Sequence, residues 1–277
     1  MQIREVTSSG NALVRVFRRA LADGVTREGW LAVEGPRLLE EALKASAEPP
    51  IGSPVTVHCV LFSRSGAERF DSLLARLRTD AEMVQVPDRL FQRVAQTQTP
   101  QGIAALVELP QADLGEILAR RDSLLLIACG LQDPGNLGTI VRSAEALGAT
   151  ALVTLAATVS PFNPKAVRSC AGAVFRLPVF SGQDPRTLFE RLRNAGVRIV
   201  ATDRYSPLSL TQAELRGPLA FLVGNEAAGL TPEIAAEGGV RLRIPIRPDT
   251  DSINAAVAAA IFLYEAARQR EFRHELV

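Results

Sequence analysis

The sequence is poor in the residues that many enzymes use as nucleophiles, bases and metal ligands. Its 277 residues include only three cysteines and two histidines. Cys59, Cys129 and Cys170 lie far apart and at no metal-binding spacing, so neither a zinc site nor a disulfide framework is predicted. Any chemistry is therefore expected to come from carboxylates, amides, hydroxyls and arginines, without a metal.

The sequence also lacks a membrane segment and a large net charge. No apolar run approaches the roughly 20 residues needed to cross a bilayer, and the longest candidate, AAVAAAIFLYEAA, is too short. The amino terminus lacks the basic and then apolar plan of a secretion signal, so we expect a cytoplasmic chain with no membrane partner. The formal net charge of +1 points to no class of partner.

Lysine is scarce as well. Only Lys44 and Lys165 are lysines among the 31 basic residues, and the rest are arginines. Arginine suits bidentate binding of phosphates and stacking on bases, but a GC-rich genome produces the same bias. The arginine content leaves both explanations open.

The chain is long enough for two domains. In residues 1–110 helical and strand-like runs alternate, which predicts a small α/β domain, and residues 111–121 are expected to form a linker or a connecting helix. In residues 122–277 near-continuous apolar runs, such as SLLLIACG and PLAFLVGNE, alternate with helical stretches. Such runs predict strands covered on both faces, and hence a parallel sheet flanked by helices.

The last helical segment, NAAVAAAIFLYEAARQR, is apolar on almost every side before its basic end. A helix of this kind needs burial all round. Burial against a second subunit is one way to supply it.

Three loops that follow predicted strands carry polar side chains. The first, GLQDPGNLGTIVRSAEALGA, presents Asn136 and Arg142, and its glycines are wrongly spaced for a dinucleotide fingerprint. The second, FLVGNEAAGLTPE, carries Glu226 directly after an apolar strand. The third, IPIRPDTDSINAAVAAAI, places Ser252 and Asn254 at the start of the apolar helix.

Each loop taken singly has an ordinary explanation as a helix cap, a solvated surface or a strand-to-helix turn. The coincidence of three such loops favours a functional site over these ordinary explanations. Ligands of open α/β sheets bind at the carboxyl ends of the strands, so the three loops together predict one shared site.

These motifs resemble the three ordered motifs of the SpoU (TrmH-type) branch of the SPOUT RNA methyltransferases. The resemblance is carried by DPGNLGTIVRSAEALGA, LVGNEAAGL and IPIRPDTDSINAAVAAAI, and it spans most of residues 125–265. The segments VEGPRLLEEAL and TQTPQGIAALVE are similar to the amino-terminal substrate-binding domain of that family, an α/β module like certain ribosomal proteins. The resemblance therefore covers nearly the whole chain.

The resemblance implies a homodimer that transfers a methyl group from S-adenosyl-L-methionine to a ribose 2′-hydroxyl in RNA. Large-subunit ribosomal RNA is the first expectation for the substrate and transfer RNA is the alternative. A non-catalytic RNA-binding protein on the same fold is a further alternative. The resemblance also implies a trefoil knot in the catalytic domain, residues 122–277, which no pattern in the sequence would predict.

The resemblance also assigns residues to roles. The catalytic set that it implies is Asn136, Arg142, Glu226, Ser252 and Asn254. The cofactor contacts that it implies are Gly224, Asn225, Ile244 and Ile253. Ala256 departs from the family pattern, because many members carry a serine there. The resemblance also implies that Arg142 helps to deprotonate the 2′-hydroxyl. Because an arginine with a pKa above about 12 is a poor base in water, we expect Arg142 to bind the adjacent phosphate and stabilise the developing alkoxide, with proton removal as the alternative once its guanidinium is desolvated.

Contacts with RNA are expected from basic side chains outside these loops. Three of them share a helix face by their spacing, one follows a Gly-Pro turn, and two lie in the segment SPFNPKAVRSCAGA. These six residues are Arg15, Arg18, Arg19, Arg37, Lys165 and Arg168. A solvated surface explains the same residues equally well.

Overall fold

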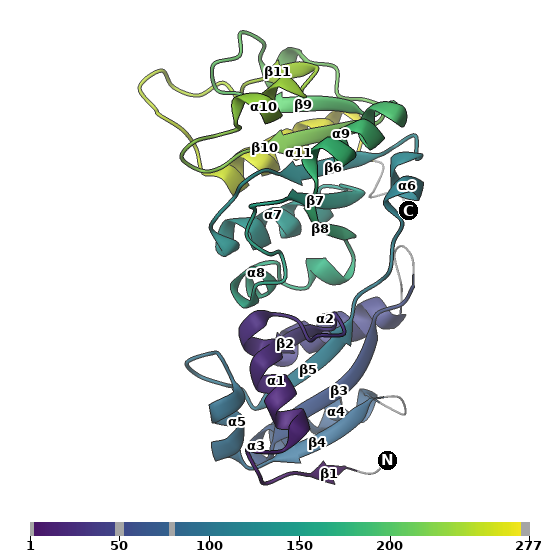
Figure 1. Ribbon diagram of the computed structural model, residues 1–277, viewed down its shortest axis with the longest axis vertical. Coiled ribbons are helices and arrows are strands. Elements are labelled where there is room, and N and C mark those ends of the chain that lie inside the picture. The colour runs from purple at the N-terminus through teal and green to yellow at the C-terminus, as the bar shows by residue number, and fades with distance from the viewer. Residues whose placement is uncertain (1–2, 48–52, 78–80, 273–277) are drawn as a thin grey trace. The chain divides into compact units, whose positions relative to one another are not determined.

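The computed structural model describes residues 3–47, 53–77 and 81–272 (Figure 1). The chain divides into two compact units. The first unit is Met1–Gln111 with Phe162–Arg176, and the second unit is Ala112–Pro161 with Leu177–Val277. Residues 162–176 therefore pack with the first unit, although they lie between segments of the second in the sequence.

The first unit is built on a five-stranded mixed sheet with strand order β1-β4-β3-β5-β2. Its strands are β1 (Arg4–Glu5), β2 (Leu31–Glu34), β3 (Thr56–Ser63), β4 (Glu82–Val86) and β5 (Ile103–Glu108). β1, β4 and β3 run parallel, whereas β5 is antiparallel to both β3 and β2. The two-residue β1 is too short to show any sequence period, and it has no counterpart among the predicted strands.

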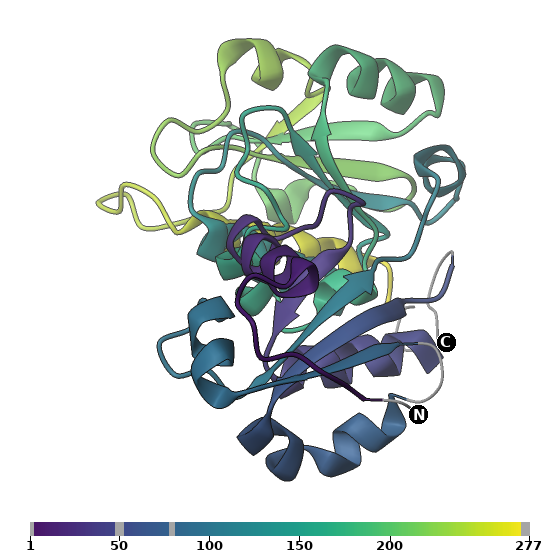
Figure 2. The same ribbon diagram turned by 60° about the horizontal axis from the view of Figure 1, so that its bottom comes forward.

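Helices cover both faces of this sheet. They are α1 (Ala12–Asp23), α2 (Pro36–Ala47), α3 (Arg64–Arg69), α4 (Asp71–Arg76), α5 (Asp88–Val94) and α8 (Pro164–Ser169), with a 3-10 turn η1 (Ala173–Phe175). Phe17 of α1 and Phe91 of α5 share one buried cluster with Leu61 and Val84 of the sheet. α2 lies on the opposite face of the sheet (Figure 2).

The second unit is built on a six-stranded parallel sheet with order β11-β9-β10-β6-β7-β8. Its strands are β6 (Leu124–Ala128), β7 (Ala151–Leu155), β8 (Val179–Gln183), β9 (Arg198–Thr202), β10 (Leu219–Val223) and β11 (Val240–Leu242). Every residue of β6, β7 and β10 is buried, which explains their continuous apolar sequence. The predicted α/β fold with a parallel second sheet is confirmed, and the half-exposed edge strand β8 was missed.

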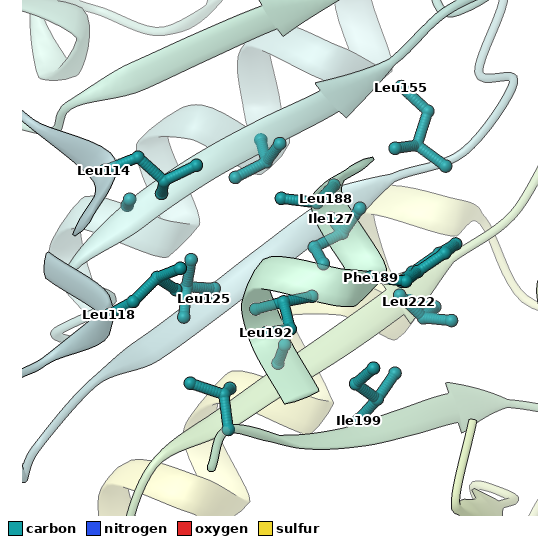
Figure 3. Close-up of a cluster of buried hydrophobic side chains, with 14 of the residues drawn as sticks. Leu114, Leu118, Leu125, Ile127, Leu155, Leu188, Phe189, Leu192, Ile199 and Leu222 are labelled. Atoms are coloured by element: carbon teal, nitrogen blue, oxygen red, sulfur yellow. The ribbon is translucent and has the colours of Figure 1, made fainter. Parts of the chain in front are cut away.

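The helices of the second unit pack on both faces of its sheet. They are α6 (Leu114–Leu118), α7 (Pro134–Ala146), α9 (Pro185–Asn194), α10 (Pro232–Ala236) and α11 (Ala255–Gln269), with a 3-10 turn η2 (Leu210–Gln212). On one face, α6 and α9 bury Leu118, Phe189 and Leu192 against the sheet (Figure 3). On the other face, Phe262 of α11 meets Phe221 of β10, with ring centroids 5.3 Å apart.

Most of the segment expected as a linker belongs to the second unit. Residues 111–121, expected as a linker or connecting helix, contain α6, whose Leu114 and Ile117 are buried in the core of the second unit.

Among the described residues, no helix is both long enough and apolar enough to cross a membrane.

Candidate functional site

The three motif loops meet at the carboxyl edge of the second sheet. The loop after β6 leads into α7, the loop after β10 leads into α10, and the loop after β11 leads into α11. β6 and β10 are parallel neighbours although about 95 residues separate them in the chain. The topology of the sheet therefore brings the first two loops together.

The first loop frees the side chain of Asn136 for long-range contacts. Asp133 is the N-cap of α7, and its carboxylate accepts hydrogen bonds from the backbone N–H groups of Gly135 and Asn136. Pro134 occupies the first turn, where its missing N–H costs nothing. Asn136 is therefore not the cap of its helix, and its side chain points to the other loops.

Asn136 joins the three loops in one hydrogen-bonded network. Its side-chain Nδ2 donates to Oε1 of Glu226 at 3.1 Å. Its Oδ1 accepts from Nδ2 of Asn254 at 2.9 Å. Oδ1 of Asn254 in turn caps α11 by accepting from the backbone N–H of Ala256 at 2.8 Å. The network Glu226–Asn136–Asn254 fixes the orientation of both amides, because each has one donor side and one acceptor side.

The second loop is held in shape by Gly224 and Asn225. A Cβ on Gly224 would lie 2.3 Å from the backbone carbonyl carbon of Gly229, so only glycine fits there. The side-chain Nδ2 of Asn225 donates to the carbonyl of Gly130 at 2.9 Å, and its Oδ1 accepts from the backbone N–H of Ala227 at 2.9 Å. Asn225 thus ties the second loop to the first.

The titration states of the site follow from these contacts. Burial raises the pKa of Glu226, but hydrogen bonds from the Asn136 amide and from backbone N–H groups outweigh burial, so the pKa lies below its ordinary value. Glu226 is therefore a carboxylate at neutral pH. Burial raises the pKa of the Cys129 thiol, which directly follows β6, to about 12, so this thiol is neutral and a poor nucleophile.

A pocket of about 210 Å³ adjoins the network. Val223, Leu242 and Phe262 contribute apolar surface to its lining, while Glu226 and Ser252 contribute polar groups. The predicted cofactor residues Gly224, Asn225, Ile244 and Ile253 all line this pocket.

The loop after β9 also contributes to the pocket, although no motif in the sequence indicated it. Asp203 and Arg204 line the same pocket. The guanidinium of Arg204 lies over the ring of Tyr205, 4.8 Å from its centroid, and Tyr205 is 79% exposed. The apolar run VRIVATD at residues 197–203 indicates a strand here, but only the position of β9 between β10 and β11 brings its carboxyl end to the pocket.

Arg142 and Ala256 lie outside the network. Arg142 is exposed on α7, and within the described ranges its guanidinium makes no hydrogen bond or ion pair. The structure therefore does not join Arg142 to Asn136 or Glu226 of its own chain. Ala256, which replaces the serine of many family members, is 3% exposed inside α11.

The predicted RNA contacts all lie in the first unit. Arg15 and Arg19 of α1 line a hollow of about 680 Å³ that also contains Asp23 and Glu28, and Arg19 pairs with Asp23 at 3.2 Å. The other predicted basic residues are exposed and do not line this hollow. They are Arg18, Arg37, Lys165 and Arg168.

Two parts of the chain match known protein families. Residues 123–264 match the SpoU rRNA Methylase family, and residues 26–105 match the MRM3-like substrate binding domain. The first match contains the loops that form the network, and the second covers most of the first unit.

Individual proteins resemble nearly the whole chain. The 23S rRNA (uridine(2479)-2'-O)-methyltransferase of Streptomyces viridochromogenes is 33% identical over 250 residues, which cover 88% of this chain and 85% of that protein. The 23S rRNA (guanosine(2553)-2'-O)-methyltransferase of Bacillus subtilis is 33% identical over 263 residues, covering 95% and 98%. The crystal structure of an AdoMet-bound rRNA methyltransferase from Sinorhizobium meliloti superposes with a TM-score of 0.81 at 28% identity, covering 97% and 98%.

Proposed function

The chain belongs to the SpoU rRNA methylase family, and we propose that it transfers a methyl group from S-adenosylmethionine to a ribose 2′-oxygen of large-subunit ribosomal RNA. One observation carries this proposal. The network Glu226–Asn136–Asn254 joins three loops beside a pocket that reaches the ends of β9, β10 and β11. The relatives named as 23S rRNA 2′-O-methyltransferases support the substrate class.

The pocket fits S-adenosylmethionine in its chemistry. The bound cofactor would supply a methyl group on a positively charged sulfur. The apolar lining suits an adenine ring, and Gly224, Ile244 and Ile253 line the same space. Among the charged groups that line the pocket, the Glu226 carboxylate supplies a negative charge that would complement a sulfonium.

The residues of the network act mainly by placement. Methyl transfer requires the ribose oxygen in line with the methyl group, and fixing such a geometry can supply roughly 7–11 kcal/mol of the barrier. Glu226 holds the Asn136 amide, and Asn254 holds it from the other side. Asn136 and Ser252 then position the ribose. Arg142 binds the neighbouring phosphate and stabilises the negative charge that develops on the 2′-oxygen, while the hydroxyl proton is released to solvent water.

Gly224→Ala is expected to weaken binding of S-adenosylmethionine by about five- to 150-fold, which corresponds to about 1–3 kcal/mol of overpacking. The added Cβ would overlap the backbone at Gly229 and Leu230, and backbone cannot rotate away as a side chain can. Isothermal calorimetry with the cofactor measures the change. Gly217→Ala, a substitution at a glycine with open space around it but a positive φ, is the control for general backbone strain. Equal cofactor affinity in wild type and Gly224→Ala would contradict the prediction.

We propose that the protein acts as a homodimer through α11. Val257, Ile261 and Tyr264 lie at helical spacing on one side of this helix and are 51%, 36% and 51% exposed. An apolar stripe of this kind is typical of a surface that a second subunit covers.

Ile261→Asp is therefore expected to shift the protein from dimer to monomer, because a carboxylate would be buried in the interface without a partner. Size-exclusion chromatography with light scattering measures the mass. Ala22→Asp is the control, because it adds the same carboxylate at an exposed position of α1, outside α11. A dimer that survives Ile261→Asp, or a wild type that is monomeric, would refute the interface.

The function is tested by two measurements on the wild type. Calorimetry should detect S-adenosylmethionine, and labelled methyl groups should appear at ribose 2′-oxygens of ribosomal RNA. RNA binding without cofactor binding would instead identify a non-catalytic RNA-binding protein, and methylation of transfer RNA alone would change the substrate. Stabilisation by NAD or ATP but not by S-adenosylmethionine would overturn the proposal altogether.

The remaining sequence predictions stay proposals. We propose that residues 1–110 form an RNA-binding domain and residues 122–277 a catalytic domain that contains a trefoil knot. The cytoplasmic location and the RNA contacts of the first unit are also proposals. Mapping 2′-O-methyl groups in total RNA with and without the protein would identify the modified nucleotide.

A further inference from the structure

A pocket lined by two arginines lies in the first unit, at a place that no sequence motif indicated. It has a volume of about 270 Å³. Its lining is formed by the loop after β1 and the start of α5, namely Thr7, Ser9, Pro87, Arg89, Leu90 and Arg93. Thr7 and Ser9 also lie outside the residues that match the substrate-binding family.

The sheet places these two segments together. β1 and β4 are parallel neighbours, and the backbone N–H of Val6 extends the pairing by donating to the carbonyl of Gln85 at 2.9 Å. Both strands end at the same edge, where the chain continues into residues 7–10 and into Pro87 respectively. The carboxyl ends of parallel strands are the usual place for ligands in α/β folds.

Hydrogen bonds fix both walls of the pocket. In the first wall, Ser8 uses its carbonyl and its hydroxyl to accept from the backbone N–H groups of Asn11 and Gly10, each at 3.2 Å. In the second wall, the backbone N–H of Leu90 donates to the carbonyl of Pro87 at 2.8 Å. The side chains of Thr7 and Ser9 take no part in these hydrogen bonds, and both residues line the pocket.

The charge of the pocket is uncompensated. Arg89 and Arg93 are four residues apart on α5 and so lie on one side of the helix, where like charges repel. Neither guanidinium, nor the hydroxyl of Thr7 or Ser9, has a hydrogen-bond or ion-pair partner within residues 3–47, 53–77 and 81–272. The adjacent carboxylate of Asp88 is turned to Ser65, whose backbone N–H donates to it at 3.2 Å.

The hollow on α1 differs in this respect. It combines its arginines with the carboxylates of Asp23 and Glu28, and one of the arginines is already paired. Among the described residues, none that line the pocket on α5 carries a carboxylate. Among the two, the α5 pocket is the better anion site.

We propose that the pocket formed by Thr7, Ser9, Arg89 and Arg93 binds a phosphate of the RNA backbone. The guanidinium groups present paired donors that match the non-bridging oxygens of a phosphodiester, and the two hydroxyls add donors from the opposite wall. Such a contact holds the RNA without reading its sequence. The proposal rests on the proposed function, because that function makes RNA the substrate.

The test is the double variant Arg89→Gln with Arg93→Gln. Its matched control is Arg76→Gln with Arg121→Gln, which removes the same charge at two exposed arginines that have no hydrogen-bond or ion-pair partner in the described part of the chain. We expect the KM for RNA to rise about tenfold in the double variant, with kcat at saturating RNA and the affinity for S-adenosylmethionine unchanged. The slope of log Kd against log salt should fall by about 0.7 for each lost phosphate contact with single-stranded RNA.

A second pair of substitutions tests the hydroxyl wall without changing charge. Thr7→Val with Ser9→Ala should raise the KM for RNA by a smaller factor and leave the salt slope unchanged. If the α5 double variant and the control have the same KM and the same slope, the phosphate site is refuted. Tight binding of inorganic phosphate by the wild type, lost in the double variant while RNA binding is kept, would refute RNA as the source of the phosphate.

The same series separates this proposal from the proposed function. A wild type that neither binds RNA nor transfers methyl groups refutes both. A wild type that does both, with an α5 double variant that behaves like the control, refutes only the phosphate site.

Discussion

Arg142→Ala is expected to lower kcat for methyl transfer by about 10²- to 10³-fold, the usual loss when one group that stabilises a developing oxyanion is removed. Arg142 is exposed on α7, and in the described part of the chain it has no partner to hold its charge. A substrate phosphate and the developing alkoxide would supply that partner. The affinity for S-adenosylmethionine should change by no more than a few-fold, because Arg142 does not line the pocket.

Steady-state kinetics and cofactor calorimetry on the same preparations measure both effects. Arg142→Lys keeps the charge but loses the paired donors, so it should fall between wild type and Arg142→Ala. If Arg142→Ala loses cofactor affinity and turnover to the same extent, the residue has a structural role instead.

Mixing of variant subunits shows which chain's Arg142 serves each site. Within the described residues Arg142 makes no hydrogen bond to the network of its own chain, so in the proposed homodimer we expect it to act on the partner's network. A mixture of Arg142→Ala and Asn136→Ala chains would then regain about a quarter of the wild-type sites, because half of the randomly paired dimers contain one complete site. A mixture as inactive as its parents would place Arg142 and Asn136 of one chain in the same site.

Much of the second unit could be predicted because its strands are covered on both faces. Continuous apolar runs have one simple explanation in a protein of this size, and β6, β7 and β10 are buried throughout. The edge strand β8 has a half-exposed pattern that resembles a loop. The two-residue β1 offers no pattern at all, so the pocket of Thr7 and Arg89 could not be found from the sequence.

The site was predictable as a meeting of loops but not as a set of bonds. Polar residues after three strands indicated a common edge, whereas the order of the strands decides which loops touch. β6 pairs with β10, and this pairing is what lets Asn136 reach Glu226 at 3.1 Å. The same order brings Asp203 after β9 into the pocket. Long-range strand order is set by packing of the whole sheet, and no local pattern encodes it.

Asn136→Asp is expected to lower turnover by about 10²-fold, the cost of misplacing a substrate-positioning group. The substitution preserves the shape of the side chain but replaces the amide donor, 3.1 Å from Glu226, by a second carboxylate. Asn136→Ala is the matched control, because it removes the same hydrogen bonds without adding a charge. It should be less impaired than Asn136→Asp at pH 8.

The stability of the wild type and that of Asn136→Asp should change with pH in opposite directions. In the wild type the pKa of Glu226 is held below its ordinary 4.5, so its contribution to stability is present above about pH 4.5 and is lost as pH falls through the lowered pKa. In Asn136→Asp the paired carboxylates raise each other's pKa, at a cost of about 1.4 kcal/mol per unit. That cost is complete above the raised pKa and is relieved as pH falls through it.

Thermal unfolding between pH 8 and pH 5 therefore distinguishes the variants. The melting temperature of Asn136→Asp should rise toward that of Asn136→Ala as pH falls, while the difference between Asn136→Ala and wild type stays constant. Parallel curves for all three proteins would mean that the two carboxylates of the variant lie apart. In that case Asn136 and Glu226 would not be in contact in solution, and placement of the ribose by Asn136 would lose its physical basis.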